Sequence, residues 1–338
     1  MVTLSASRAR IWVALVVVYV VWGSTYLGID LAVRTIPPFL MAAVRFLVAG
    51  SLLYAWAIRR GDRRRLDGAG NERRRRLGRR RSGNRSDRPT ARHWLSAFLI
   101  AAPMLAIGNA AVGWAEQTID TGTASLIIAS VPLWMALLDR VFYAQRLARV
   151  VVLGLVIGFA GVGLLVTPGG AGGAGSRAAF VLVFSSLAWA IGSLYSRHAL
   201  LPRRPLVAAA MQMLAGGLML TIVAAVSGEL GRVHPTQISG ESWFGLAYLV
   251  VAGSLLGFTT YMWLLRAAPT SLVGTYAYVN PVVAVLLGTV LLGEGLSWRM
   301  LVGGGIIVAS VALIVRAPKR SPHATIEPRP AAVAVRGR

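Results

Sequence analysis

The chain has 338 residues, of which 56% are hydrophobic and only 14% charged, a composition that excludes an ordinary soluble globular protein of this length. The formal net charge of +23 is typical of a nucleic-acid-binding protein, but fifteen of the 35 Lys and Arg residues lie between Arg59 and Arg92, where there is no aromatic residue for base stacking. The chain has no cysteine, which excludes disulfides, thiolate ligands and sulfur nucleophiles. We therefore expect a membrane protein that binds no nucleic acid.

Ten apolar stretches follow one another along the chain. A hydrocarbon core about 30 Å thick requires about 20 apolar residues in a helix. The stretches are continuously apolar, which favours helices, because the strands of a membrane barrel alternate polar and apolar residues. The predicted fold is an all-α membrane protein with ten transmembrane helices. The expected spans are residues 11–29, 38–58, 94–115, 121–138, 150–167, 178–196, 206–227, 243–265, 270–292 and 300–315.

The distribution of arginine predicts the orientation of these spans. If the N-terminus is cytoplasmic, 30 of the 35 Lys and Arg residues fall in inner segments and four in outer segments, and the remaining one lies within a span. Positive residues accumulate on the cytoplasmic side of membrane proteins. We therefore expect both termini in the cytoplasm. The arginine-rich loop 59–93 should be disordered, and its most plausible partner is anionic lipid.

The second half of the chain repeats the first. An offset of 167 residues places Trp22 on Trp189, and an offset of 149 residues places Pro132 on Pro281. Each copy holds five spans, and an odd number of crossings inverts the second copy relative to the first. We therefore expect two inverted five-helix repeats. The predicted units are residues 1–167 for the first repeat, 168–176 for a glycine-rich linker, 177–316 for the second repeat and 317–338 for a disordered cytoplasmic tail.

Arg45 is the one full charge well inside a predicted span. An arginine within hydrocarbon costs a few kcal/mol, so its side chain should face the bundle interior and find a partner. One interpretation is structural: the guanidinium clamps neighbouring helix ends or reaches toward the membrane surface. The other is direct contact with a substrate. Its repeat mate, Gln212, is also polar, which indicates a shared interior face.

Aromatic and small residues occur together in the first and sixth spans. Trp22 is followed by glycine, serine, Thr25 and Tyr26, and Trp189 is followed by glycine, serine and Tyr195. Glycine and serine let a ligand approach the backbone, while tryptophan and tyrosine offer flat walls with a hydrogen-bonding edge. The alternative is helix packing through small residues, with the aromatic residues at the membrane interface.

Two prolines interrupt spans at equivalent positions. Pro132 and Pro281 each free a carbonyl group one turn earlier and kink the helix. Asn280 precedes the second proline and can hydrogen-bond in the gap, and Tyr276 lies one turn earlier on the same face. Matched discontinuities point to a binding site, although a mechanical kink is the alternative. Asn109 in the third span is a further candidate for the site. A hydrogen bond between helices is the equally weighted alternative for this amide.

The carboxylates lie near the ends of spans. Asp30, Glu116, Asp120 and Glu294 fall at outer ends, Asp139 falls at an inner end, and none lies at mid-depth. A proton-coupled carrier usually places a titratable acid in its pathway. Glu116 and Glu294 are therefore the candidates for proton coupling, with a solvated helix end as the alternative for each.

The glycines indicate where helices can pack closely, and the positions of the histidines indicate whether a metal site is expected. Gly154, Gly158 and the run 303–305 form small-residue faces, which suit close packing within the monomer or across a homodimer. The four histidines lie in loops or the tail without metal-ligand spacing. We expect neither a metal site nor a cofactor.

Several segments resemble EamA-type carriers of the drug/metabolite transporter superfamily. They are residues 22–26 (WGSTY), 45–46 (RF), 115–117 (AEQ), 122–126 (GTASL), 132–133 (PL), 278–282 (YVNPV) and 292–294 (LGE). The resemblance covers about residues 11–316. It implies two inverted repeats around a cavity lined mainly by spans 1, 3, 4, 6, 8 and 9, and export of small metabolites, often amino acids, or of toxic compounds. Gln145 stands where the second repeat has Glu294, which argues against an essential carboxylate pair.

These observations together predict a multi-pass carrier of the bacterial inner membrane that exports a small metabolite by alternating access. A membrane enzyme would need a convergent catalytic group at one depth, and the sequence has none. A scaffold that recruits partners through the arginine-rich loop would not need matched interior polar residues in both halves. The expected substrate-binding residues are Trp22, Thr25, Tyr26, Arg45, Asn109, Trp189, Tyr195, Tyr276 and Asn280.

Overall fold

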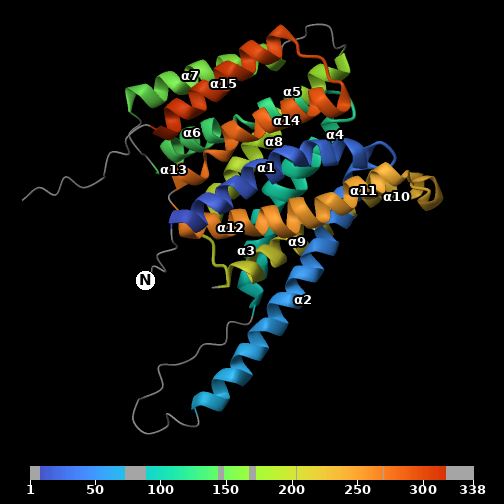
Figure 1. The fold of residues 1–338 in the computed structure, drawn as a ribbon, viewed down its shortest axis with the longest axis vertical. Helices are drawn as coiled ribbons and strands as arrows, with labels where there is room; N and C mark the ends of the chain where they lie inside the picture. The colour runs from blue at the N-terminus through green and yellow to red at the C-terminus, as the bar shows by residue number, and fades with distance from the viewer. Residues whose placement is uncertain are drawn as a thin grey trace, which may run out of the picture.

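The computed structural model describes residues 8–72, 89–143, 148–166, 173–202, 204–268 and 270–316. Helices and short connections make up all of these ranges, which contain no strand (Figure 1). Within them, eight helices are long and apolar enough to cross a membrane, and two further apolar helices, Val279–Leu292 and Trp298–Ile314, are shorter. The prediction of an all-α membrane protein is therefore confirmed.

The first half of the chain provides five of these apolar segments. Its third segment is continuous but contains a π-helical part, and its fourth is broken at residues 129–130. The elements are α1 (Arg8–Val33), α2 (Pro38–Glu72), α3 (Ala91–Ala101), η1 (Ala102–Asn109), α4 (Ala110–Ala115), α5 (Thr121–Ile128), α6 (Val131–Tyr143) and α7 (Arg149–Val166).

The second half follows the same order. A π-helical part again lies within the third long segment, and a break at residues 274–275 precedes the proline-containing helix. The elements are α8 (Gly173–Ser196), α9 (Pro205–Val226), α10 (Glu229–Arg232), η2 (Pro235–Gln237), α11 (Gly240–Tyr248), η3 (Leu249–Phe258), α12 (Thr259–Ala267), α13 (Thr270–Val273), α14 (Tyr276–Leu292) and α15 (Trp298–Arg316).

The structure corrects the boundaries expected for the arginine-rich segment and the linker. Helix α2 does not stop at Arg59 but continues to Glu72, so that it extends away from the bundle (Figure 1). Arginine, leucine, alanine and glutamate are good helix formers, and extending an existing helix requires no new nucleus. Similarly, α8 begins at Gly173, inside the predicted linker 168–176. The rest of the predicted loop up to residue 88, the linker residues before Gly173 and the tail 317–338 lie outside the described residues.

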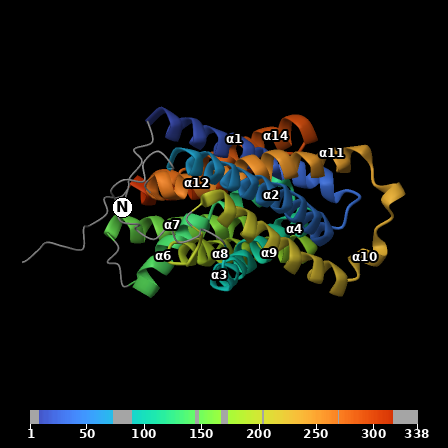
Figure 2. The same cartoon turned by 90° about the horizontal axis from the view of Figure 1, so that it is seen from below.

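The helices are arranged in two layers. Figure 2 shows α1, α11 and α14 in one layer and α3, α8 and α9 in the other. Helix α1 packs on α11, η3, α12 and α14, whereas α8 packs on η1, α4, α5 and α6. The first helix of each half therefore packs on the third and fourth segments of the other half.

Helices α2 and α9 cross through a contact that occurs twice. A β-carbon on Gly50 would lie 3.0 Å from Cγ of Leu214, and a β-carbon on Gly217 would lie 2.8 Å from Cγ of Leu47. Gly50 corresponds to Gly217, and Leu47 to Leu214, at the offset of 167 residues. Residue numbers rise along one helix as they fall along the other, so these two equivalent helices run antiparallel.

Helices α7 and α15 repeat this arrangement at one end of the bundle (Figure 1). A β-carbon on Gly154 would lie 2.8 Å from Cγ1 of Ile314, and one on Gly303 would lie 3.0 Å from Cγ of Leu165. These two contacts also exchange under the offset of 149 residues. The predicted small-residue faces thus pack within one chain at these glycines, and the homodimer stays a prediction.

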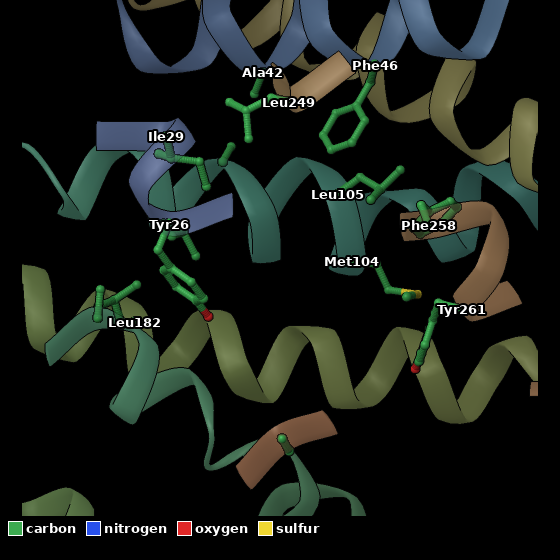
Figure 3. Close-up of a cluster of buried hydrophobic side chains, with 14 of the residues drawn as sticks. Tyr26, Ile29, Ala42, Phe46, Met104, Leu105, Leu182, Leu249, Phe258 and Tyr261 are labelled. Atoms are coloured by element: carbon green, nitrogen blue, oxygen red, sulfur yellow. The ribbon is translucent and has the colours of Figure 1, made fainter. Parts of the chain in front are cut away.

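Apolar side chains fill the interior and also cover the outside. Phe46 of α2 and Leu105 of η1 are buried next to each other in the centre (Figure 3). Large apolar residues on the outer faces are exposed, as shown by Val156 at 65%, Phe180 at 65% and Leu286 at 62%. Such an apolar exterior is expected for helices that face lipid rather than water.

Candidate functional site

A cavity of about 80 Å³ lies between the two layers. A water molecule needs about 10–15 Å³ on this measure, so the space accommodates several waters or part of a small ligand. Both halves of the chain contribute to its wall. The lining residues are Trp22, Thr25, Tyr26, Ile29, Arg45, Phe46, Leu105, Gly108, Asn109, Val112, Ile128, Val131, Ser185, Trp189, Gly253, Phe258, Tyr276 and Asn280.

Aromatic rings cluster around Trp22 at the site. Trp189 and Tyr276 line the cavity together with it, and Tyr261 packs against Trp22 without lining the cavity. The Trp22 ring lies 6.0 Å from that of Trp189 and 5.3 Å from that of Tyr276, in both cases edge to face. Tyr261 completes the group at 4.7 Å from Trp22. Edge-to-face pairs at these distances are favourable and hold the rings rigidly. Trp22 and Trp189, which the offset of 167 residues relates, therefore pack against each other.

Tyr261 was not among the predicted residues. It lies one turn after Gly257, where a β-carbon would be only 2.7 Å from the indole nitrogen of Trp22. Gly257 is the repeat mate of Gly108, which lines the cavity. The face of the eighth segment that carries Gly257 could therefore have identified Tyr261 from the repeat alone.

Arg45 also lines the cavity and is only 3% exposed. Its Nε donates to Oγ of Ser254 at 2.9 Å, and its guanidinium donates to Oδ1 of Asn109 at 3.3 Å. The described ion pairs with carboxylates involve Arg34 and Arg197, and Arg45 is not among them. Since a guanidinium has five N–H donors, Arg45 both links α2 to η1 and η3 and retains donors for a further acceptor.

The two predicted amides take different roles. Asn109 accepts the hydrogen bond from Arg45 and lines the cavity. Asn280 lies with its amide nitrogen toward the carbonyl oxygens of Tyr19 and Tyr276, each at 3.2 Å. This contact satisfies backbone acceptors close to Pro281, the proline inside α14. Pro132, in contrast, lies in the first turn of α6, where a missing N–H has no cost.

The π-helical segments place backbone groups at the cavity. Such segments are rare and often occur at functional sites. Segment η1 contains Pro103 near its start, which removes one backbone donor, and η3 contributes Gly253. Ser185 of α8 donates to the carbonyl oxygen of Gly108 at 2.6 Å. A β-carbon on Gly253 would lie 2.8 Å from the Arg45 guanidinium, so this glycine leaves room for the arginine.

The remaining predicted residues divide between the cavity and the surface. Thr25 and Tyr26 line the cavity, and Thr25 donates to the carbonyl oxygen of Trp22 at 2.6 Å. Tyr195 does not reach the cavity and is 39% exposed. Gln212, the mate of Arg45, is fully buried, but it does not line the cavity. Eight of the nine predicted substrate-binding residues are therefore brought together, and their role in binding stays a prediction.

The two candidate proton-coupling residues occupy different environments. Glu294 accepts hydrogen bonds from the backbone nitrogens of Thr121 and Gly122 at 2.8 and 3.1 Å, and from Oγ1 of Thr121 at 2.7 Å. It therefore caps the N-terminus of α5 and ties it to the segment after α14. Glu116 is 6% exposed, and neither carboxylate oxygen has a hydrogen-bond partner among the described residues. The alternative of a solvated helix end does not fit Glu116.

The titratable groups at this end influence one another. Burial raises the pKa of the Asp120 carboxyl, and the nearby charge of Glu294 adds to the shift. Arg34 pairs with Asp30 at 2.9 Å and with Glu241 at 2.9 Å. Across the described part of the chain, no three His, Asp or Glu residues are grouped as metal ligands would be.

Comparisons with known proteins agree with this arrangement. The sequence profile of the EamA-like transporter family matches residues 80–167 and 176–316. A relative from Escherichia coli K12, named "Uncharacterized inner membrane transporter YedA", is 36% identical over 302 residues, which is 89% of each chain. A WAT1-related chloroplastic protein of Arabidopsis thaliana is 23% identical over 309 residues, covering 90% of this chain and 69% of its own length. A crystal structure with 19% identity aligns with a TM-score of 0.61 over 91% of this chain and 98% of the other, which shows a shared fold.

The helical architecture, the apolar exterior and these relatives define the class first: this is an integral membrane transporter. More narrowly, the chain belongs to the EamA-like transporter family.

Proposed function

We propose that this protein is an alternating-access carrier that exports a small amphipathic carboxylate, such as an amino acid, across the bacterial inner membrane. One observation carries the substrate class: the buried cation Arg45 faces an aromatic-lined cavity without a carboxylate partner among the described ion pairs. A buried charge needs a counter-charge or a full set of hydrogen bonds. A substrate carboxylate supplies both, while its apolar body lies against the rings of Trp22, Trp189 and Tyr276.

The proposal includes ten spans in two inverted five-helix repeats. The antiparallel crossing of α2 on α9 supports it, because equivalent helices of the two halves run in opposite directions. The matched π-helical segments η1 and η3 support it as well, since residues 102–109 correspond to 251–258. A cavity between inverted repeats is the arrangement that lets one half rock against the other.

The arginines and the relatives support the proposed orientation and location. The ratio of 30 inner to four outer positive residues supports cytoplasmic termini, and the relative YedA is named an inner membrane transporter. In this orientation Glu294 joins α5 to the segment after α14 at the outer end. We also propose that the arginines between residues 59 and 92 bind anionic lipid head groups. Export, rather than import, rests on the family resemblance.

The substrate class is tested with purified protein in liposomes and radiolabelled phenylalanine, which combines a carboxylate with an aromatic ring. Phenylalaninamide, which keeps the ring and the ammonium group but lacks the carboxylate, should compete poorly. Replacing Arg45 with Gln should weaken apparent affinity by about 10- to 150-fold, because a hydrogen bond to a charged group contributes about 1.5–3 kcal/mol. Equal competition by the acid and the amide would contradict the proposed carboxylate.

Matched controls separate binding from folding. Arg34→Gln removes an arginine that is exposed at the outer surface and does not line the cavity, so transport should be unchanged. Arg45→Lys keeps the charge but loses the two-pronged geometry, and we expect an intermediate affinity. Export is tested by comparing inside-out with right-side-out membrane vesicles: uptake should occur in the inside-out vesicles.

A further inference from the structure

Glu116 is a buried carboxyl group that has no hydrogen-bond partner in the part of the chain that the structure describes. It follows directly after the membrane span Ala91–Ala115, at the end of the molecule where Glu294 caps α5. Its side chain is 6% exposed, and both of its oxygens lack hydrogen bonds among the described residues. Leaving an ionised carboxylate in such a place costs several kcal/mol. Burial therefore favours the protonated, neutral form of Glu116.

The acidic groups Asp30 and Glu294 act on Glu116 through their charge. From α1 it is faced by Asp30 and Tyr26, and from the segment after α14 it is faced by Glu294. The neighbouring Arg34 is already bound to Asp30 and Glu241. Burial raises the pKa of the Glu116 carboxyl well above its usual range, and the charges of Asp30 and Glu294 raise it further.

From this geometry we infer that Glu116 binds the coupling proton of the carrier and is neutral while the outer end is closed. The inference rests on the proposed transport function. It assigns different roles to the two carboxyl groups at this end: Glu294 accepts hydrogen bonds and holds α5, whereas Glu116 takes up and releases a proton. The step is a simple protonation, in which the carboxylate oxygen and one H⁺ from water form a carboxylic acid.

The pH dependence of closure follows from the different solvation of Glu116 in the open and closed states. In the closed state the pKa of Glu116 is raised, and in a state that admits water it returns toward the usual value. Proton binding therefore favours closure below the raised pKa, and this preference is lost as the pH rises through it. Closure therefore takes up a proton from the outer solution. Tyr26 lines the cavity and also faces Glu116.

The protonation state is measured without any substrate. Infrared spectra of the full-length protein in lipid at neutral pH should contain the carbonyl stretch of a protonated carboxylic acid, and Glu116→Gln should lack it. Glu229→Gln is the matched control, because Glu229 is also buried, at 5% exposure, but accepts a hydrogen bond from the backbone nitrogen of Leu40 at 2.8 Å. That variant should retain the band. Identical carboxylic-acid signals in wild type and Glu116→Gln would overturn the inference.

Transport of radiolabelled phenylalanine in liposomes then tests the coupling. Glu116→Gln should keep exchange of labelled for unlabelled substrate at equal pH but lose accumulation driven by a pH gradient. Accumulation at the wild-type level, or loss of exchange together with accumulation, would contradict coupling through Glu116. If wild-type protein fails to exchange the probe, the proposed substrate class is wrong, and the infrared comparison still decides whether Glu116 holds a proton.

Discussion

Arg45 and Gln212 occupy equivalent positions in the two halves, yet their surroundings differ. Arg45 lines the central cavity and is hydrogen-bonded to Ser254 and Asn109. Gln212 is fully buried, does not line the cavity, and its amide has no hydrogen-bond partner among the described residues. The two positions lie at matching places on α2 and α9, whereas their side chains differ, and Arg45 brings its charge to the cavity.

The largest expected loss of stability comes from adding a charge at the equivalent position of the other half. Gln212→Arg places a cation where neither a cavity nor a described partner receives it, and an unpaired buried charge costs about 3–5 kcal/mol. We expect a low yield of folded protein in the membrane and a strongly lowered midpoint of thermal unfolding in detergent. Gln212→Leu removes an unsatisfied amide at similar volume and should be neutral or stabilising. Destabilisation by leucine would indicate that the amide has a partner.

The scaffold should respond equally in both halves. Gly50→Ala and Gly217→Ala each bring a β-carbon to about 3 Å from the partner helix, where the backbone nitrogens of Leu214 and Leu47 also lie. Overpacking of this kind costs about 1–3 kcal/mol, so both thermal midpoints should fall by similar amounts. Gly163→Ala is the control, because nothing lies within 4 Å of its β-carbon position. Clearly different changes in the thermal midpoint for Gly50→Ala and Gly217→Ala would contradict the equivalence of the two contacts.

The end of the molecule where Glu294 caps α5 should give a smaller effect. Glu294→Gln keeps the shape of the cap but removes the charge at the N-terminus of α5, which should cost about 0.5–2 kcal/mol in the free energy of unfolding. Arg34→Gln removes exposed ion pairs with Asp30 and Glu241, and such pairs contribute about 0–1 kcal/mol. Denaturation monitored by circular dichroism orders the two variants, and a larger loss for Arg34→Gln would contradict the assigned cap.

Much of the fold could be predicted because hydrophobicity and arginine placement are strong signals along a membrane chain. The helical extension of α2 to Glu72 could not, since the same arginine-rich sequence suits a disordered loop or an extended helix. The contact of Glu294 with Thr121 could not be predicted either, because it joins residues 173 positions apart. Such contacts depend on tertiary packing rather than on local pattern.

The candidate site was predictable where repeat mates or buried polar residues marked it. Trp22, Trp189, Asn109 and Asn280 all line the cavity. Tyr195 does not, and helix geometry gives the reason. Tyr26 follows Trp22 by four residues and lies on the same face, whereas Tyr195 follows Trp189 by six residues and points about 120° away. Matching positions rather than residue types would have excluded it.

Substrate protection of a cavity residue tests the central claim most directly. The chain has no cysteine, so Thr25→Cys introduces a single thiol at the cavity wall, and Ser24→Cys places one on the next residue, which contacts Tyr248 instead. A small polar thiol reagent should label Thr25→Cys, and phenylalanine should slow that labelling while phenylalaninamide does not. Labelling of Ser24→Cys should be unaffected by either compound. If phenylalanine protects neither position, or both equally, the cavity is not the binding site.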